Sequence, residues 1–173
     1  MIKLRSAQFS DYAMIAKLHA KSWQQNYRGI FSHPFLDKEV EQERSGFWYN
    51  KLKFPKENQQ VTVASLDENM VGFSCLLLND DPAFGSLLDN LHVSMTLQKS
   101  GVGKLLMKEC AKSICDKSNT KKMYLWVYES NKNAIRFYER LGGINVETAD
   151  RQNEDGTKAK ALRCIWTDGS QLI

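Results

Sequence analysis

Apolar side chains recur at helical spacing in two segments near the beginning of the chain. Between residues 11 and 26 they share one broad face that runs from Met14 to Trp23, and Ser10 precedes this face as a candidate helix cap. A second helix is expected over residues 37–52, because prolines stand before and after its apolar positions. The sequence therefore predicts two helices before its first long strand.

From Val61 onward the apolar pattern changes to one typical of strands. Residues 61–66 and 70–78 are predicted to form a hairpin with a tight polar turn, and residues 79–82 break the sheet. Gly142 ends a later helix in the position that favours a left-handed backbone. Further strands are expected over residues 2–5, 87–94, 123–128, 144–148 and 161–167, and further helices over residues 102–114 and 134–141. This order predicts an α/β fold.

The strand over residues 87–94 leads directly into the most informative loop of the chain. Strict alternation along this strand places Asp89, Leu91 and Val93 on one face, and Asn90 and His92 on the other. We therefore expect His92 to be a packing or surface residue first and a substrate contact second.

Composition restricts the class of protein. A chain of 173 residues that is 42% hydrophobic and 25% charged fits one globular domain over residues 1–173. No apolar run approaches the ~20 residues of a membrane span, and the basic N-terminus lacks the apolar stretch of a secretory signal, so we expect a cytoplasmic protein without a membrane partner. The cysteines and histidines show no metal-ligand spacing, and no metal site or disulfide framework is predicted.

The net charge of +4 is mildly basic. It favours an anionic ligand, but no dense block of lysine and arginine marks a nucleic-acid groove. A nucleic-acid-binding domain is therefore an alternative that rests on the net charge alone.

A glycine-containing loop follows the strand over residues 87–94. Gly101 and Gly103 stand at the beginning of a helix, where free backbone N–H groups converge on the space in front of them, and Lys99 and Lys104 add positive charge. The structural alternative is a flexible turn with a glycine cap. The functional interpretation is a site for a pyrophosphate.

Two common phosphate loops do not fit this segment. A P-loop requires glycine where Gln98 stands, and the dinucleotide fingerprint requires glycine or alanine where Leu106 stands. What remains is one motif after a strand, Gln98-x-x-Gly101-x-Gly103, and a second motif after a later strand, Asn131-x-x-Ala134-x-x-Phe137-Tyr138-x-x-x-Gly142. This pair of motifs resembles the GNAT superfamily of N-acetyltransferases, and the predicted order of elements resembles that family over most of the chain. The resemblance implies a single-domain GNAT-like fold, with a strongly twisted, mixed central sheet flanked by helices.

The resemblance also implies acetyl-CoA as the co-substrate. In this pattern the backbone of the strand pairs with the pantetheine arm, the glycine-containing loop holds the pyrophosphate, Asn131 hydrogen-bonds the arm, and Ala134 and Phe137 pack against it. The implied cofactor-binding residues are Leu91, His92, Val93, Gln98, Lys99, Ser100, Gly101, Val102, Gly103, Lys104, Asn131, Ala134, Phe137 and Tyr138.

The implied reaction is direct attack of a primary amine on the acetyl thioester, without a covalent acyl-enzyme. Tyr138 is the residue implied to protonate the leaving thiolate, since a phenol of pKa ~10 can donate to a thiolate whose conjugate acid has a pKa of ~8.5 when the geometry assists. Asp89 is the first candidate for the base and Glu129 the second. The structural alternatives are a half-buried aromatic for Tyr138, a carboxylate paired with a lysine for Asp89, and a capping or solvated residue for Glu129.

The N-terminal helices form the acceptor side in this family, and here they are rich in aromatic residues. An aromatic-lined cleft is therefore expected there, and the structural alternative for each ring is a core position. The acceptor is expected to be a small-molecule or peptide amine. For the oligomeric state, the sequence leaves both a monomer and a homodimer as alternatives. The segment from Ser22 to Phe31 resembles one found in a bacterial branch of these enzymes. A non-catalytic acyl-CoA sensor or partner-binding module is the alternative function, because a fold does not fix an activity.

Overall fold

One seven-stranded sheet organises the structure, a computed structural model that describes residues 1–173. The strand order is β1-β2-β3-β4-β5-β7-β6, and every neighbouring pair is antiparallel except β4 with β5. The strands are β1 (Lys3–Ser6), β2 (Gln59–Leu66), β3 (Asn69–Asp81), β4 (Gly85–Val93), β5 (Met123–Tyr128), β6 (Ile144–Gln152) and β7 (Lys158–Trp166). The helices are α1 (Tyr12–Asn26), α2 (Val40–Lys53), α3 (Val102–Lys117) and α4 (Lys132–Arg140). This arrangement confirms the predicted α/β fold.

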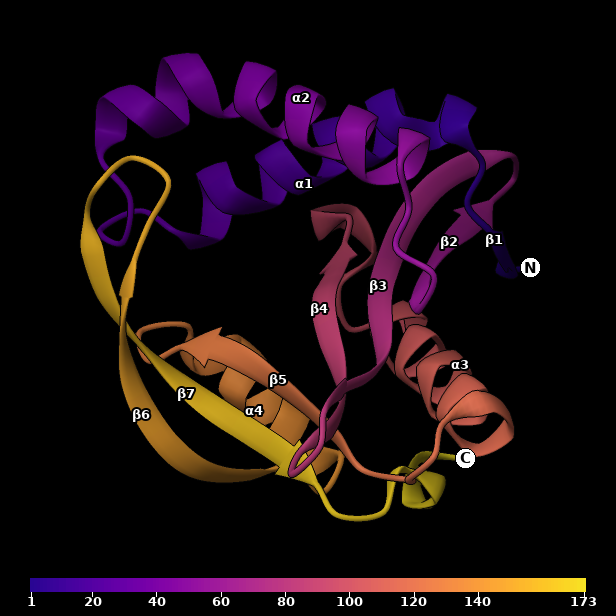
Figure 1. Ribbon diagram of the computed structural model, residues 1–173. Helices are drawn as coiled ribbons and strands as arrows, with labels where there is room; N and C mark the ends of the chain where they lie inside the picture. The colour runs from indigo at the N-terminus through magenta and orange to yellow at the C-terminus, as the bar shows by residue number, and fades with distance from the viewer.

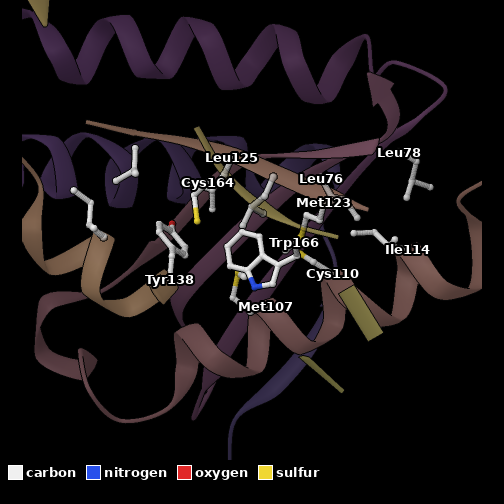
Figure 2. Packing of buried hydrophobic residues seen from close by; sticks show 13 residues of the cluster. Leu76, Leu78, Met107, Cys110, Ile114, Met123, Leu125, Tyr138, Cys164 and Trp166 are labelled. Carbon is white, nitrogen blue, oxygen red and sulfur yellow. The ribbon is translucent and has the colours of Figure 1, made fainter. Parts of the chain in front are cut away.

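Helices cover both faces of the sheet. The pair α1 and α2 lies across one face, and α3 and α4 pack on the other (Figure 1). On the second face, Tyr138 of α4 and Met107 of α3 point into one apolar cluster with Leu125 of β5 and Trp166 of β7 (Figure 2). None of the helices is long and apolar enough to span a membrane.

The beginning of α1 differs from the sequence prediction. A 3₁₀ turn over Phe9–Asp11 precedes the helix, and Asp11 rather than Ser10 closes it by accepting a hydrogen bond of 2.7 Å from the backbone N–H of Gln8. Asp11 is buried and also binds the Arg5 guanidinium, so the turn is tied to β1. Met14, predicted to share the apolar face, is 51% exposed because the buried stripe of α1 is narrower than expected.

A β-bulge in β4 changes the direction of its side chains. Leu88 pairs with Leu76 and Asn90 pairs with Cys75, so Asp89 is an extra residue without a partner in β3. The carboxylate of Asp89 therefore lies on the α2 side of the sheet. The prediction that Asp89 shares a face with Leu91 and Val93 is wrong, because it assumed unbroken alternation.

Strands β4 and β5 diverge soon after they meet. Their parallel pairing consists of Ser86 with Met123 and Leu87 with Tyr124, and no pairing continues beyond these positions (Figure 1). The backbone of β4 from Leu88 onward therefore has a free edge on the β5 side.

The turn between β6 and β7 is fastened to the loop that follows α1. Asn153 is buried, accepts a hydrogen bond of 2.7 Å from the Tyr128 hydroxyl and donates one to the carbonyl of Ile30. The backbone N–H of Ser32 donates to Asp155 at 2.6 Å. These contacts hold the β6-β7 hairpin against the α1 side of the molecule and close one end of the space between them.

Candidate active site

The beginning of α3 presents unpaired backbone donors to solvent. The first hydrogen bond of this helix runs from Leu105 N–H to the Gly101 carbonyl, which leaves the N–H groups of the preceding helical residues without helical partners. Gly101 has φ +92° and Lys99 has φ +66°, so two left-handed residues turn the chain into the helix. Lys99, Ser100 and Lys104 are exposed around this turn. The arrangement suits an anion, as the sequence indicated.

Gly103 allows α3 to approach α4 closely. A side-chain carbon at this position would lie 3.2 Å from the Phe137 ring and 3.8 Å from the Val93 side chain. The turn before α3, the end of β4 and the apolar face of α4 therefore converge at Gly103.

The end of β4 offers its free backbone edge next to this turn. The side chains of Leu91 and Val93 pack toward Val102 and Leu106 of α3, while the His92 ring lies on the opposite face, 4.2 Å from the ring of His19 in α1. The predicted opposition of His92 to its two neighbours is confirmed. Backbone groups between these side chains remain available to an extended ligand lying between β4 and β5.

Helix α4 places the second sequence motif on the other side of this gap. Asn131 caps the helix, with its side-chain oxygen accepting from the Ala134 N–H at 3.2 Å, so its amide N–H₂ group is left to bind a ligand. Tyr138 is 9% exposed and packs against Phe137 and Trp166. Burial, with a smaller contribution from the nearby Tyr27, raises the pKa of Tyr138 above its ordinary value and keeps the phenol protonated.

A cavity of about 710 Å³ opens where β4 and β5 diverge, on the side covered by α1. Its walls come from α1, from both diverging strands and from the β6-β7 hairpin. The lining residues are His19, Trp23, Tyr27, Leu87, Leu88, Asp89, Asn90, His92, Tyr124, Trp126, Tyr128, Arg151, Gln152, Asn153, Glu154 and Ala161. The lining includes tryptophan and tyrosine side chains from α1, from the residue that follows it and from β5. Trp23 of α1 and Tyr27, which directly follows α1, belong to the aromatic-rich N-terminal region that was expected to form the acceptor side.

The two candidate bases occupy different environments. Asp89 lines the cavity and accepts a hydrogen bond of 2.8 Å from Lys51 and another from Asn90. Glu129 lies exposed in the turn after β5 and outside the cavity lining. The structure brings only Asp89 to the cavity, and the lysine pairing considered for it from the sequence is present.

Two histidines form a neutral wall of the cavity next to β4. The indole N–H of the buried Trp48 donates to Nδ1 of His19 at 2.9 Å, which places the proton of a neutral His19 on Nε2. Nδ1 of His92 lies 2.9 Å from the Ser22 hydroxyl. Burial lowers the pKa of both rings, assisted for His19 by His92 and for His92 by the Arg44 charge, and His92 reaches a pKa of about 3.

These depressed pKa values predict acid sensitivity. Histidine in the unfolded chain takes up a proton at pH ~6.5, whereas folded His92 does so only near pH 3. As the pH decreases between these two values, the free energy of unfolding therefore falls by ~1.4 kcal/mol per pH unit. Above the higher value the free energy of unfolding is unaffected by this group. We expect denaturant titrations to show that His92 alone lowers the free energy of unfolding by about 2 kcal/mol between pH 7.5 and pH 5. His92→Gln should flatten this dependence, and His33→Gln, which changes an exposed histidine, should not. Equal slopes for His92→Gln and wild type would contradict the assignment.

The comparison with known proteins settles the family. A family model described as "Acetyltransferase (GNAT) family" matches residues 18–143. The chain belongs to the GNAT acetyltransferases. Its resemblance to that family, drawn from the two glycine-containing motifs, is therefore confirmed.

One relative matches nearly the whole of this GNAT chain, and another matches only part of it. An uncharacterized N-acetyltransferase, YuaI, of Bacillus subtilis is 26% identical and covers 99% of this chain and 96% of its own. The spermine/spermidine N(1)-acetyltransferase of the same species is 33% identical over 55 residues, which is 32% of this chain and 36% of that protein.

Solved structures show the same fold at low sequence identity. A GCN5-related N-acetyltransferase from Rhodopseudomonas palustris has a TM-score of 0.77 at 17% identity and covers 95% of this chain and 94% of its own. The PaiA N-acetyltransferase from Thermoplasma acidophilum, solved in complex with coenzyme A, has a TM-score of 0.72 at 18% identity and covers 93% of this chain and 98% of its own.

One buried residue beside this GNAT site, Arg44, was not a candidate at the sequence level. Arg44 is 3% exposed, and its guanidinium lies 4.2 Å from the Trp23 ring and 4.3 Å from the Phe47 ring. It pairs with Glu43 and, at 3.4 Å, with Glu154 of the hairpin turn. The only sequence signal was an arginine among aromatic residues, which does not distinguish a buried cation from a solvated one.

Proposed function

We propose that this protein transfers an acetyl group from acetyl-CoA to a primary amine bound in the cavity beside β4. The observation that carries the proposal is the free edge of β4, which leads from the anion-binding turn of α3 to the cavity. His92, whose neighbours Leu91 and Val93 lie on that edge, has its side chain in the cavity lining. A ligand held along the edge would therefore present its end to a second ligand in the cavity.

The chemistry of these residues fits acetyl-CoA. Backbone donors and Lys104 at the α3 turn suit a pyrophosphate, the edge of β4 and the amide of Asn131 suit the amides of a pantetheine arm, and Phe137 offers an apolar contact. The coenzyme A complex of the PaiA relative supports the same choice of ligand. When bound, acetyl-CoA supplies an acetyl group activated as a thioester.

Two proton transfers by this chain's own residues complete the proposed reaction. Asp89, directly or through water, accepts a proton from the amine as the new C–N bond forms, and backbone N–H groups near Val93 donate to the oxyanion of the tetrahedral intermediate. As the C–S bond breaks, Tyr138 donates its phenolic proton to the sulfur. No acyl-enzyme is formed.

Asp89 and Glu129 can be separated by matched substitutions. We expect Asp89→Asn to lower kcat about 10²-fold or more, because the amide cannot accept the amine proton, and Glu129→Gln to leave kcat unchanged. Steady-state kinetics with saturating acetyl-CoA measures both. The reverse order of effects would assign the base to Glu129, and full activity of both variants would assign it to water alone.

Product analysis tests the function itself. The protein is incubated with acetyl-CoA and a panel of primary amines, while thiol release is followed and the amines are analysed by mass spectrometry. We expect a mass increase of one acetyl group on the amine, together with stoichiometric thiol release and no acetylated protein. A bound cofactor without turnover of any amine would favour the non-catalytic sensor.

A further inference from the structure

Two arginines lie on the same face of the β5-β7-β6 sheet, and one of them, Arg151, lines the cavity. In the strand register Arg163 lies opposite Trp126 on one side and Glu147 on the other, while Arg151 lies opposite Ala159. Residues two apart along a strand share a face, so Arg151 and Arg163 both lie on the cavity side with Trp126. The neighbouring residues on this face are alanines at positions 149, 159 and 161, whose short side chains leave space above the sheet between the two arginines.

Arg151 is the member of this pair that faces the ligand space without a partner. It lines the cavity, is exposed, and stacks its guanidinium 4.1 Å from the centre of the Trp126 ring. No carboxylate lies within salt-bridge distance of it. Stacking on the indole orients the guanidinium plane and leaves its N–H edge free for an anion.

Arg163 packs against the same ring. Its guanidinium lies 3.8 Å from the Phe84 ring and 4.7 Å from the Trp126 ring, and its Nε is 3.2 Å from Glu147 in a geometry that makes no hydrogen bond. Its pairing with Glu147 offsets its charge, so Arg163 packs against Trp126 without adding an unpartnered cation to the cavity.

The carboxylates of the cavity already have cationic partners. Asp89 is paired with Lys51, and Glu154 is paired with Arg44. The two lining histidines are neutral at ordinary pH. The cavity therefore offers no unpartnered anion to a polycationic amine, but it does offer one unpartnered cation.

We propose that Arg151 binds a carboxylate of the acceptor, so that the acceptor class is an amine that carries a carboxylate elsewhere in the same molecule, such as an amino acid or a short peptide. This inference rests on the proposed acetyl transfer. The amine would lie toward Asp89 on β4 and the carboxylate toward Arg151 on β6, on opposite sides of one cavity. A guanidinium binds a carboxylate through two parallel N–H···O bonds, which gives both affinity and orientation.

The test uses acceptor pairs that differ only in the carboxylate. The pairs are glycine and methylamine, 4-aminobutyrate and propylamine, 6-aminohexanoate and pentylamine, and L-phenylalanine and 2-phenylethylamine, with spermidine as a polycation. We expect the carboxylate-bearing member of at least one pair to have a kcat/KM about 10- to 100-fold higher than its partner, as for a charged hydrogen bond, and spermidine to be the poorest acceptor.

Variants connect this preference to Arg151. Arg151→Gln should raise KM for the preferred acid about 10- to 100-fold and leave its decarboxylated partner unchanged, while Arg151→Lys should recover part of the preference. Lys158→Gln removes the same charge from the opposite face of β7 and should change neither substrate. Melting temperatures and acetyl-CoA affinity, both expected to match wild type, show that the variants are folded.

The possible failures are distinct. Acetylation of simple amines without preference for any acid, or a preference that survives in Arg151→Gln, overturns the carboxylate site and leaves acetyl transfer intact. Absence of acetyl-CoA binding together with absence of thiol release overturns the proposed function itself. Acetyl-CoA binding without acetylation of any member of the panel also overturns the carboxylate site.

Discussion

Tyr138→Phe is expected to lower kcat by about 10²- to 10⁴-fold, the range for losing a general acid, without changing the affinity for acetyl-CoA. The substitution removes one oxygen from a side chain that is 9% exposed and keeps the ring that packs against Phe137 and Trp166. Burial raises the pKa of Tyr138, so the phenol is protonated before the transfer. Steady-state kinetics, with calorimetry of acetyl-CoA binding, measures the two quantities separately.

The matched control is Tyr49→Phe. Tyr49 lies on α2 outside the cavity lining, where its hydroxyl accepts a hydrogen bond from Lys53. It should retain wild-type kcat. If Tyr138→Phe has the same kcat as Tyr49→Phe at every pH, Tyr138 is a packing residue and the proton comes from water.

Gly103→Val is expected to weaken acetyl-CoA binding by about 10- to 100-fold, equivalent to the 1–3 kcal/mol that overpacking costs. The first added carbon already lies 3.2 Å from the Phe137 ring, so the two further methyl groups push the start of α3 away from α4 and from the end of β4. The parts of the cofactor site then no longer converge. Isothermal calorimetry with acetyl-CoA measures the change.

Gly46→Val serves as the control for Gly103→Val. Gly46 lies in α2 with nothing within 4 Å of an added Cβ, so the first added carbon, which approaches the Phe137 ring at Gly103, meets no neighbour there. Wild-type affinity in both variants would show that the α3 turn does not hold the cofactor.

The turn before α3, which we propose to hold the cofactor, was predictable because its chemistry is local. Gly101, which has a left-handed backbone, and the residues that follow it specify a turn and a helix start without reference to the rest of the chain. The glycine that follows α4 was also predicted from local sequence, and Gly142 has φ +84° as expected of that position. Motifs confined to one turn are predictable because their backbone geometry depends only on adjacent residues.

Features that depend on distant partners were not predictable. The Asp89 bulge interrupts a strand whose alternation looks regular, and it becomes apparent only when Leu76 and Cys75 of β3 are set beside it. The buried Asn153 lies between the strands predicted over residues 144–148 and 161–167, but its bond to Ile30 joins residues 123 apart. The position of the Arg151 guanidinium likewise depends on stacking against Trp126, which lies two strands away.

Calorimetric titration with acetyl-CoA tests the central claim most directly, because it needs no knowledge of the acceptor. We expect one binding site per chain, weakened several-fold by Lys104→Glu, since reversal of a charge at a helix start opposes an anion by about 1 kcal/mol or more. Absence of heat and of any melting-temperature shift, with both acetyl-CoA and free coenzyme A and with protein shown to be folded, would contradict the assignment of the α3 turn and of acetyl transfer.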